Sequence, residues 1–178
     1  MEILRTISLY VEGKNMPFLV IGGHAVNAYG LSRQTGDLDL LVRDDEKRVW
    51  IDLMNKLHLR AGQSDDRFAR FQPEAFTGWP IDLMFVDRAT FAKLFEQSIE
   101  VSFGPARARV ASARHLVAMK LHALKQDQEH RLAKDFGDIV GLLRSGRTGL
   151  TVEELRSLCL RYATVEWFDK LKDQVPRS

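Results

Sequence analysis

The sequence predicts an α+β protein in which a mixed sheet flanked by helices is followed by a C-terminal helical region. Short apolar runs, helical patterns and glycine or proline turns alternate over residues 1–111, which is typical of strands and helices around one core. From residue 112 onward, apolar residues recur only at helical spacing. Because the composition changes there without a linker, we expect an α+β core over 1–111 and a helical region over 112–178 packed on it.

Length and composition narrow the class of protein. A chain of 178 residues, 45% hydrophobic and 28% charged, is typical of one globular domain with a helical appendage. The single cysteine, Cys159, excludes an intramolecular disulfide. No stretch approaches the roughly 20 apolar residues that span a bilayer, and the charged N-terminal segment resembles an amphipathic helix more than a signal peptide. We therefore expect a cytoplasmic protein without a membrane partner, and a net charge of +2 neither requires nor excludes nucleic acid.

The first elements follow from apolar spacing and from turn residues. Ile3, Ile7 and Tyr10 lie at helical spacing, and Gly13 can end that helix. The apolar run after Pro17 predicts a buried strand. The elements expected here are a helix over 2–13, a strand over 18–21, a short helix that closes at Gly30, a strand over 37–43, and a helix from Asp44 to about His58.

The later elements are predicted by the same signals. We expect strands over 67–72 and 79–86 around a turn-rich PEAFTG connection, a helix over 89–97, and short strands over 98–103 and 106–111. From Ser112 the pattern predicts three or four helices, with breaks near 126–128, 145–149 and 162–164.

Two acidic residues lie on the strand expected over 37–43. Residues two apart in a strand point the same way, so Asp37 and Asp39 project from one face while Leu38 and Leu40 enter a core. A solvated face is the ordinary explanation of such a pair. If the strand that carries Asp82 lies beside this one, three carboxylates converge, and their mutual repulsion calls for a divalent cation. Such a cluster suits two Mg²⁺ ions, which prefer oxygen ligands.

A glycine pair precedes the acids. Gly22-Gly23 ends a strand and opens a helix, where free backbone N–H groups and the helix dipole favour an anion. Alone, such a pair is more often a tight turn than a phosphate site. Together with the acids it predicts a site for a triphosphate and its metals.

These residues carry a resemblance to a known superfamily. The run Ile21-Gly22-Gly23, followed after thirteen residues by Asp37-Leu38-Asp39-Leu40, resembles the signature of the DNA polymerase β-type nucleotidyltransferases, and Ile81-Asp82-Leu83 is similar to their separate third-acid motif. The fuller string GGHAVNAYGLSRQTGDLDLLV resembles the branch of AbiEii-type toxins and minimal nucleotidyltransferases, and small antibiotic nucleotidyltransferases share much of it. The resemblance covers residues 17–143 and implies a nucleotidyltransferase-like sheet.

A helical segment extends the resemblance. LVAMKLHALKQDQEHRLAKDFGDIVGLL is similar to the AbiEii branch, which carries a lysine and then a Lys-Asp pair on consecutive helices. This implies that Lys120 binds phosphate and that Lys134 or Asp135 faces the active-site cleft. Without the resemblance, a lysine that reaches the surface and i,i+4 ion pairs such as Lys134–Asp138 explain these residues.

Residues near the glycine turn complete the expected nucleotide site. Arg33 offers a planar fork that suits phosphate oxygens, and Thr35 can hold the loop before the acids; a solvated arginine and a turn threonine are the alternatives. Many superfamily members have Gly-Ser at the turn, whereas here Gly23 precedes His24, itself a candidate cleft residue. The phosphate contact of that serine must come from backbone N–H groups or another side chain. Trp79 is expected in the core, with stacking on a base as the alternative.

The resemblance implies a magnesium-dependent nucleotidyltransferase that moves a nucleoside monophosphate from a nucleoside triphosphate, such as ATP, to an acceptor hydroxyl. Asp37 and Asp39 would hold two Mg²⁺ ions, and Asp82 would ligate one of them and accept the hydroxyl proton. A toxin-like protein would use a tRNA end or a protein as acceptor and have an antitoxin partner. The alternatives are an antibiotic nucleotidyltransferase that acts on a small hydroxylated molecule, and a noncatalytic nucleotide- or protein-binding module with the same fold.

Overall fold

The computed structural model describes residues 2–74, 78–125 and 129–176. Contacts within the chain divide it into two compact units, residues 1–25 with 33–111 and residues 26–32 with 112–178. The first unit contains the sheet, and the second contains the C-terminal helices. No helix in the described ranges is long and apolar enough to cross a membrane.

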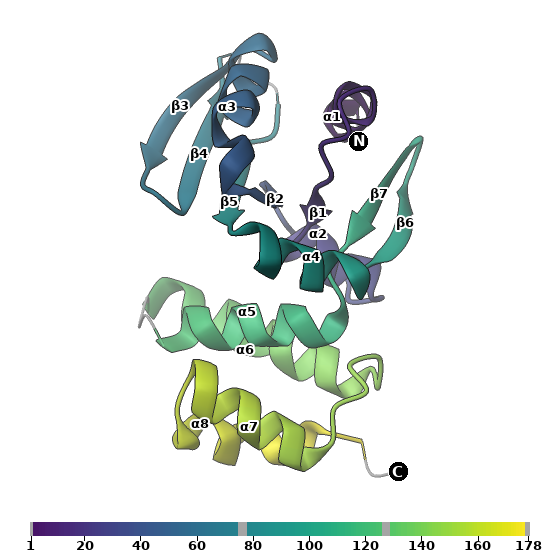
Figure 1. The fold of residues 1–178 in the computed structure, drawn as a ribbon. Helices are drawn as coiled ribbons and strands as arrows, with labels where there is room; N and C mark the ends of the chain where they lie inside the picture. Colours follow the sequence, from purple (N-terminus) through teal and green to yellow (C-terminus); the bar gives the residue numbers. More distant parts are fainter. Residues whose placement is uncertain (1, 75–77, 126–128, 177–178) are drawn as a thin grey trace. The chain divides into compact units, whose positions relative to one another are not determined.

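A seven-stranded mixed sheet forms the first unit, with the strand order β3-β4-β5-β2-β1-β7-β6 (Figure 1). The strands are β1 (Leu19–Val20), β2 (Leu38–Arg43), β3 (Leu59–Ser64), β4 (Phe68–Pro73), β5 (Ile81–Val86), β6 (Ile99–Phe103) and β7 (Ala106–Val110). The β2–β5 and β1–β7 pairs are parallel, and the others are antiparallel. The predicted mixed sheet is therefore present.

The centre of the sheet is held by apolar side chains of β2 and β5. Leu38 and Leu40 are fully buried, as predicted for the core-facing side of that strand. Ile81 and Leu83 are buried to the same extent on β5. These two strands thus bury a continuous apolar surface, and their polar residues are fixed relative to it.

Four helices belong wholly or partly to the sheet unit: α1 (Glu2–Glu12), α2 (Gly22–Ala28), α3 (Lys47–Lys56) and α4 (Arg88–Glu96). The helix predicted to start at Asp44 instead begins with a 3-10 turn over Asp44–Glu46. In α1, Leu4, Ile7 and Val11 are buried, so the helix is present but its buried face includes only Ile7 of the three residues that predict it. Asp87 caps α4 by accepting a hydrogen bond from the Thr90 backbone N–H at 2.9 Å.

Strand β3 forms where the sequence pattern predicts no strand. Of its six residues only Leu59 is buried, and the segment contains Gly62. It lies at the edge of the sheet, where it pairs only with β4. Backbone pairing rather than a buried face defines this strand, so the hydrophobic pattern does not reveal it.

The second unit consists of α5 (Ala113–Lys125), α6 (Glu129–Arg144), α7 (Val152–Tyr162) and α8 (Val165–Leu171), with residues 26–32. The predicted breaks near 145–149 and 162–164 are confirmed, while the break at 126–128 lies outside the described residues. Helix α6 approaches the 26–32 segment closely, because a Cβ on Gly141 would lie 2.1 Å from the Leu31 Cδ2. A larger residue at 141 would have to displace Leu31.

Helix α7 begins with a capping box. The Thr151 hydroxyl accepts from the Glu154 backbone N–H at 3.2 Å, and the Glu154 carboxylate accepts from the Thr151 backbone N–H at 3.0 Å. Thr151→Ala should lower the free energy of unfolding by about 1 kcal/mol, because it leaves the Glu154 N–H without its acceptor. Urea denaturation followed by circular dichroism measures this. Ser157→Ala, which removes an exposed hydroxyl bond within the same helix, is the control and should cost nothing; equal losses in both variants would contradict the role of the cap.

Candidate active site

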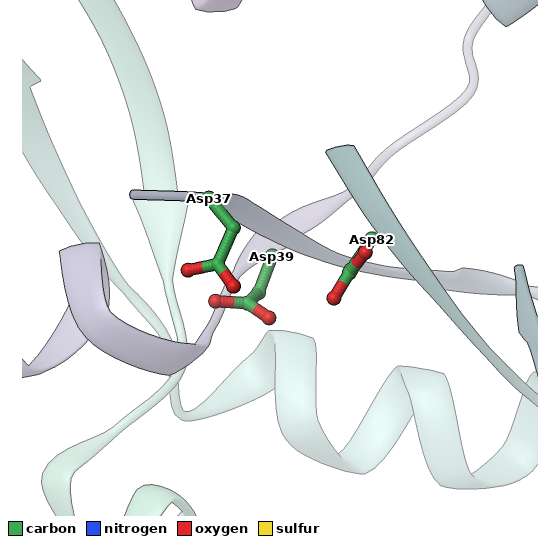
Figure 2. Close-up of side chains that lie close together, drawn as sticks. All are labelled: Asp37, Asp39 and Asp82. Carbon is green, nitrogen blue, oxygen red and sulfur yellow. The ribbon is translucent and has the colours of Figure 1, made fainter. Parts of the chain in front are cut away.

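Three carboxylates meet where β2 and β5 pair (Figure 2). Asp39 and Asp82 are direct partners in the parallel register, and Asp37 lies just before β2. One carboxylate oxygen from each of Asp37, Asp39 and Asp82 lies within 4.8 Å of the chosen oxygens of the other two. The strands that carry the acids are therefore neighbours in the sheet, which is what the convergence of the three carboxylates requires.

The three acids differ in burial. The Asp82 side chain is only 10% exposed, whereas that of Asp37 is 28% exposed. Concentrating three negative charges in a partly buried position raises their mutual repulsion. Oxygen donors at this spacing fit hard divalent cations such as Mg²⁺, so this donor set could hold a metal.

The glycine turn lies directly against the acids. Gly22 has φ +60, and a Cβ there would lie 1.9 Å from the Asp39 Oδ2. A Cβ on Gly23 would lie 2.5 Å from the Thr35 Oγ1 and 2.6 Å from the Arg33 Nη2. The two glycines are therefore required for close approach, Gly22 to the second acid and Gly23 to the loop before the first.

That loop orients Asp37. The Thr35 hydroxyl donates to the Asp37 Oδ1 at 3.2 Å and lies 3.4 Å from the Asp37 backbone oxygen. Arg33 donates through Nη1 to the Gln34 backbone oxygen at 3.0 Å, which holds its guanidinium beside Gly23. Thr35 thus contacts Asp37, and Arg33 lies beside the glycine turn that is predicted to bind the phosphates.

His24 and Trp79 form a ring contact in the sheet unit. Their ring centroids are 4.7 Å apart, and His24 is buried. Burial lowers the pKa of His24, and Asp37 opposes this effect, so the buried imidazole favours its neutral form. Trp79 is 38% exposed, so its expected place in the core is wrong. The residue precedes Pro80 in the connection to β5, outside the alternating pattern that buries Ile81.

Arg70 is the site residue that sequence reasoning missed. It lies on β4 opposite Asp82 and donates to both oxygens of that carboxylate, through Nε at 2.8 Å and Nη2 at 2.6 Å. Its Nη2 also reaches the Asp37 Oδ2 at 3.4 Å. The hydrogen bonds that Arg70 donates to Asp82 raise the pKa of Arg70, so the guanidinium stays charged. Pairing the strands around PEAFTG as an antiparallel hairpin would have placed Arg70 opposite Asp82.

Lys120 lies in the helical unit within a buried ionic cluster. Its ammonium is 2.7 Å from the Asp135 Oδ1 and 2.6 Å from the Asp138 Oδ2. All three side chains are almost fully buried, so a lysine at the surface and a solvated ion-pair face are both wrong for this cluster. Lys134, the other candidate cleft residue, is exposed. The structure thus brings Lys120 and Asp135 together and leaves Lys134 outside the pair.

The family described as nucleotidyl transferase AbiEii toxin, Type IV TA system, matches residues 3–169. The chain belongs to this family. It is a nucleotidyltransferase. No curated protein matches its sequence.

Solved nucleotidyltransferase structures share its fold. An antigenic nucleotidyltransferase-like protein from Paracoccidioides brasiliensis is similar with a TM-score of 0.60 and 12% identity, over 99% of this chain and 93% of that one. The enzyme ANT(2")-Ia in complex with adenylyl-2"-tobramycin has a TM-score of 0.67 and 14% identity, over 91% and 97%. The lincomycin-bound lincosamide antibiotic adenylyltransferase LnuA has a TM-score of 0.56 and 12% identity, over 77% and 92%. The predicted nucleotidyltransferase-like fold is confirmed.

Replacing the glycine at the second acid tests whether close approach matters for transfer by this AbiEii-family protein. Gly22→Ala forces its Cβ into the Asp39 carboxylate and strains a backbone at positive φ. Nucleotidyl transfer into a cell extract should fall on the order of 100-fold, because a carboxylate displaced by about 1 Å misaligns the site. Gly13→Ala is the matched control, since a Cβ there meets nothing within 4 Å. Wild-type transfer by a folded Gly22→Ala variant would contradict the prediction.

Proposed function

We propose that the protein transfers a nucleoside monophosphate from a nucleoside triphosphate to an acceptor hydroxyl, with magnesium, and that it acts as the toxin of a toxin–antitoxin pair. The observation that carries this proposal is the convergence of Asp37, Asp39 and Asp82 within 4.8 Å. The position of the glycine turn against Asp39 supports it, because the backbone that would face the phosphates then lies beside the acids. Family membership supports the toxin role.

The three acids are the residues that would hold two Mg²⁺ ions. When bound, such ions neutralise charge on the phosphates and activate the acceptor oxygen. The carboxylates supply hard oxygen donors from two strands whose register is fixed by buried neighbours. Thr35 would keep the Asp37 carboxylate oriented through its hydroxyl.

The chemical step exchanges one bond to the α-phosphorus for another and moves one proton. The acceptor oxygen bonds to the α-phosphorus, the bond from the α-phosphorus to the β-phosphate oxygen breaks, and pyrophosphate leaves with the electron pair. Asp82 would accept the hydroxyl proton. Arg33 and the backbone N–H groups of Gly22-Gly23 would bind phosphate oxygens, supported by the position of the Arg33 guanidinium beside the turn.

The family resemblance supports roles for two residues of the helical unit. Lys120 would bind a phosphate, and Asp135 would face the nucleotide cleft. Because the Lys120 ammonium is already held by Asp135 and Asp138, a phosphate contact requires it to exchange one of these partners. His24, buried beside Trp79, is the further cleft residue, and the partly exposed indole of Trp79 is a surface on which a base can stack.

The acceptor distinguishes the toxin from an antibiotic-modifying enzyme. We propose an RNA end, such as that of tRNA, or a protein hydroxyl, because the toxin family matches residues 3–169. The antibiotic alternative rests on ANT(2")-Ia and LnuA, which share only 14% and 12% identity with this chain.

Substituting the first acid tests the site. Asp37→Asn should abolish magnesium-dependent transfer while the protein stays folded, because the change keeps size and removes one charged ligand. Pyrophosphate release measures transfer, and circular dichroism measures folding. Asp52→Asn, at an exposed position of α3, changes the same charge and should leave transfer unchanged. Unchanged turnover in Asp37→Asn would overturn the mechanism.

Labelling identifies the acceptor and tests for a noncatalytic module. The protein is incubated with each labelled nucleoside triphosphate, Mg²⁺ and a cell extract, and the label is sought in the RNA, protein and small-molecule fractions. We expect label in a macromolecular fraction; label only in added aminoglycosides or lincosamides would favour the antibiotic enzyme. Isothermal titration that shows nucleotide binding without any pyrophosphate release would favour the noncatalytic module.

A further inference from the structure

Arg70 occupies the oxygens that the proposed metal site needs. It faces Asp82 across the antiparallel β4–β5 pair, and its Nε and Nη2 lie 2.8 and 2.6 Å from the two oxygens of that carboxylate. The same Nη2 is 3.4 Å from the Asp37 Oδ2. One guanidinium therefore bridges two of the three acids. This fork-to-carboxylate pair has the geometry of a strong, charge-assisted interaction.

A divalent cation and this guanidinium oppose each other at Asp82. A metal ligated by the carboxylate would lie about 2 Å from its oxygen, close to the positive charge of Arg70. The resulting repulsion is large in a partly desolvated site. The Asp82 side chain is 10% exposed, whereas that of Arg70 is 40% exposed. Arg70 can therefore turn toward solvent while Asp82 stays fixed by the sheet.

We propose that Arg70 is an internal counter-cation that exchanges with the divalent metal at Asp82, an inference that rests on the proposed metal site. Without metal, Arg70 neutralises part of the charge and holds Asp37 and Asp82 together. Metal binding displaces its fork from Asp82. Arg70 is thus a positioning residue that sets the metal concentration at which the site loads.

A purely structural role for Arg70 makes the opposite prediction. If Arg70 only ties β4 to β5, its loss loosens the acids and weakens metal binding. If it competes with the metal, its loss strengthens metal binding, although the metal-free protein becomes less stable because the acids repel each other. The sign of the change in metal affinity therefore decides between the two roles.

The experiment measures Mn²⁺ binding without nucleotide, from the loss of the free-ion signal in electron paramagnetic resonance. Arg70→Gln should bind Mn²⁺ at least about tenfold more tightly than the wild type, the minimum expected for loss of a competing charged hydrogen bond. Arg60→Gln, at an exposed position on β3, removes the same charge and should bind within about twofold of the wild type. Affinity of Arg70→Gln equal to or weaker than that of the wild type would overturn the proposal.

Thermal unfolding provides a second readout. The melting temperature of metal-free Arg70→Gln should be lower than that of the wild type, and Mn²⁺ should raise it by more. If Arg70→Gln does not fold, Arg70→Lys keeps the charge but loses the rigid two-bond fork to Asp82, and it too should bind Mn²⁺ more tightly. No tightening in that variant would also overturn the exchange. If neither the wild type nor any variant binds Mn²⁺, the proposed metal site fails as well; wild-type binding without tightening in the variants removes only the role of Arg70.

Discussion

The parallel register of β2 and β5 is the constraint on which the acidic site depends. A slip of one residue would turn the acids to opposite faces and expose the leucines beside them. Leu38, Leu40, Ile81 and Leu83 are fully buried, and such side chains contribute roughly 1.5–3 kcal/mol each. Together they outweigh the repulsion of two carboxylates about 4 Å apart, roughly 4 kcal/mol at an effective dielectric constant near 20. Apolar burial thus fixes charges that would otherwise separate.

The chain balances concentrated negative charge twice, in two different ways. In the sheet unit, the cation is an arginine whose side chain is partly exposed. In the helical unit, Lys120 is enclosed with Asp135 and Asp138, and one ammonium faces two carboxylates. The first arrangement can release its cation into water, whereas the second can exchange it only for another buried partner. This difference suits a site that takes up ions and a cluster that ties α5 to α6 unless a phosphate competes for the ammonium.

Much of the fold follows from the sequence because its elements bury periodic apolar residues. The acids were predictable for the same reason, since Asp37 and Asp39 alternate with Leu38 and Leu40. Edge strand β3 was not predicted because it is held by backbone pairing with β4 and buries little side-chain surface. The contact of Arg70 with the acids was not predicted because it depends on the register of the β4–β5 pair, which hydrophobic periodicity does not specify. Trp79 was misplaced because an aromatic residue before Pro80 follows the geometry of the connection rather than hydrophobicity.

The chain passes between the two units more than once. Residues 26–32 belong to the helical unit, although the segments on either side belong to the sheet unit. The chain therefore passes between the units three times, after residues 25, 32 and 111. Cutting it at 111 would leave 26–32 without the residues against which Leu31 is seated. Arg33 follows this segment directly, so the loop before Asp37 begins in the chain where a segment of the helical unit ends.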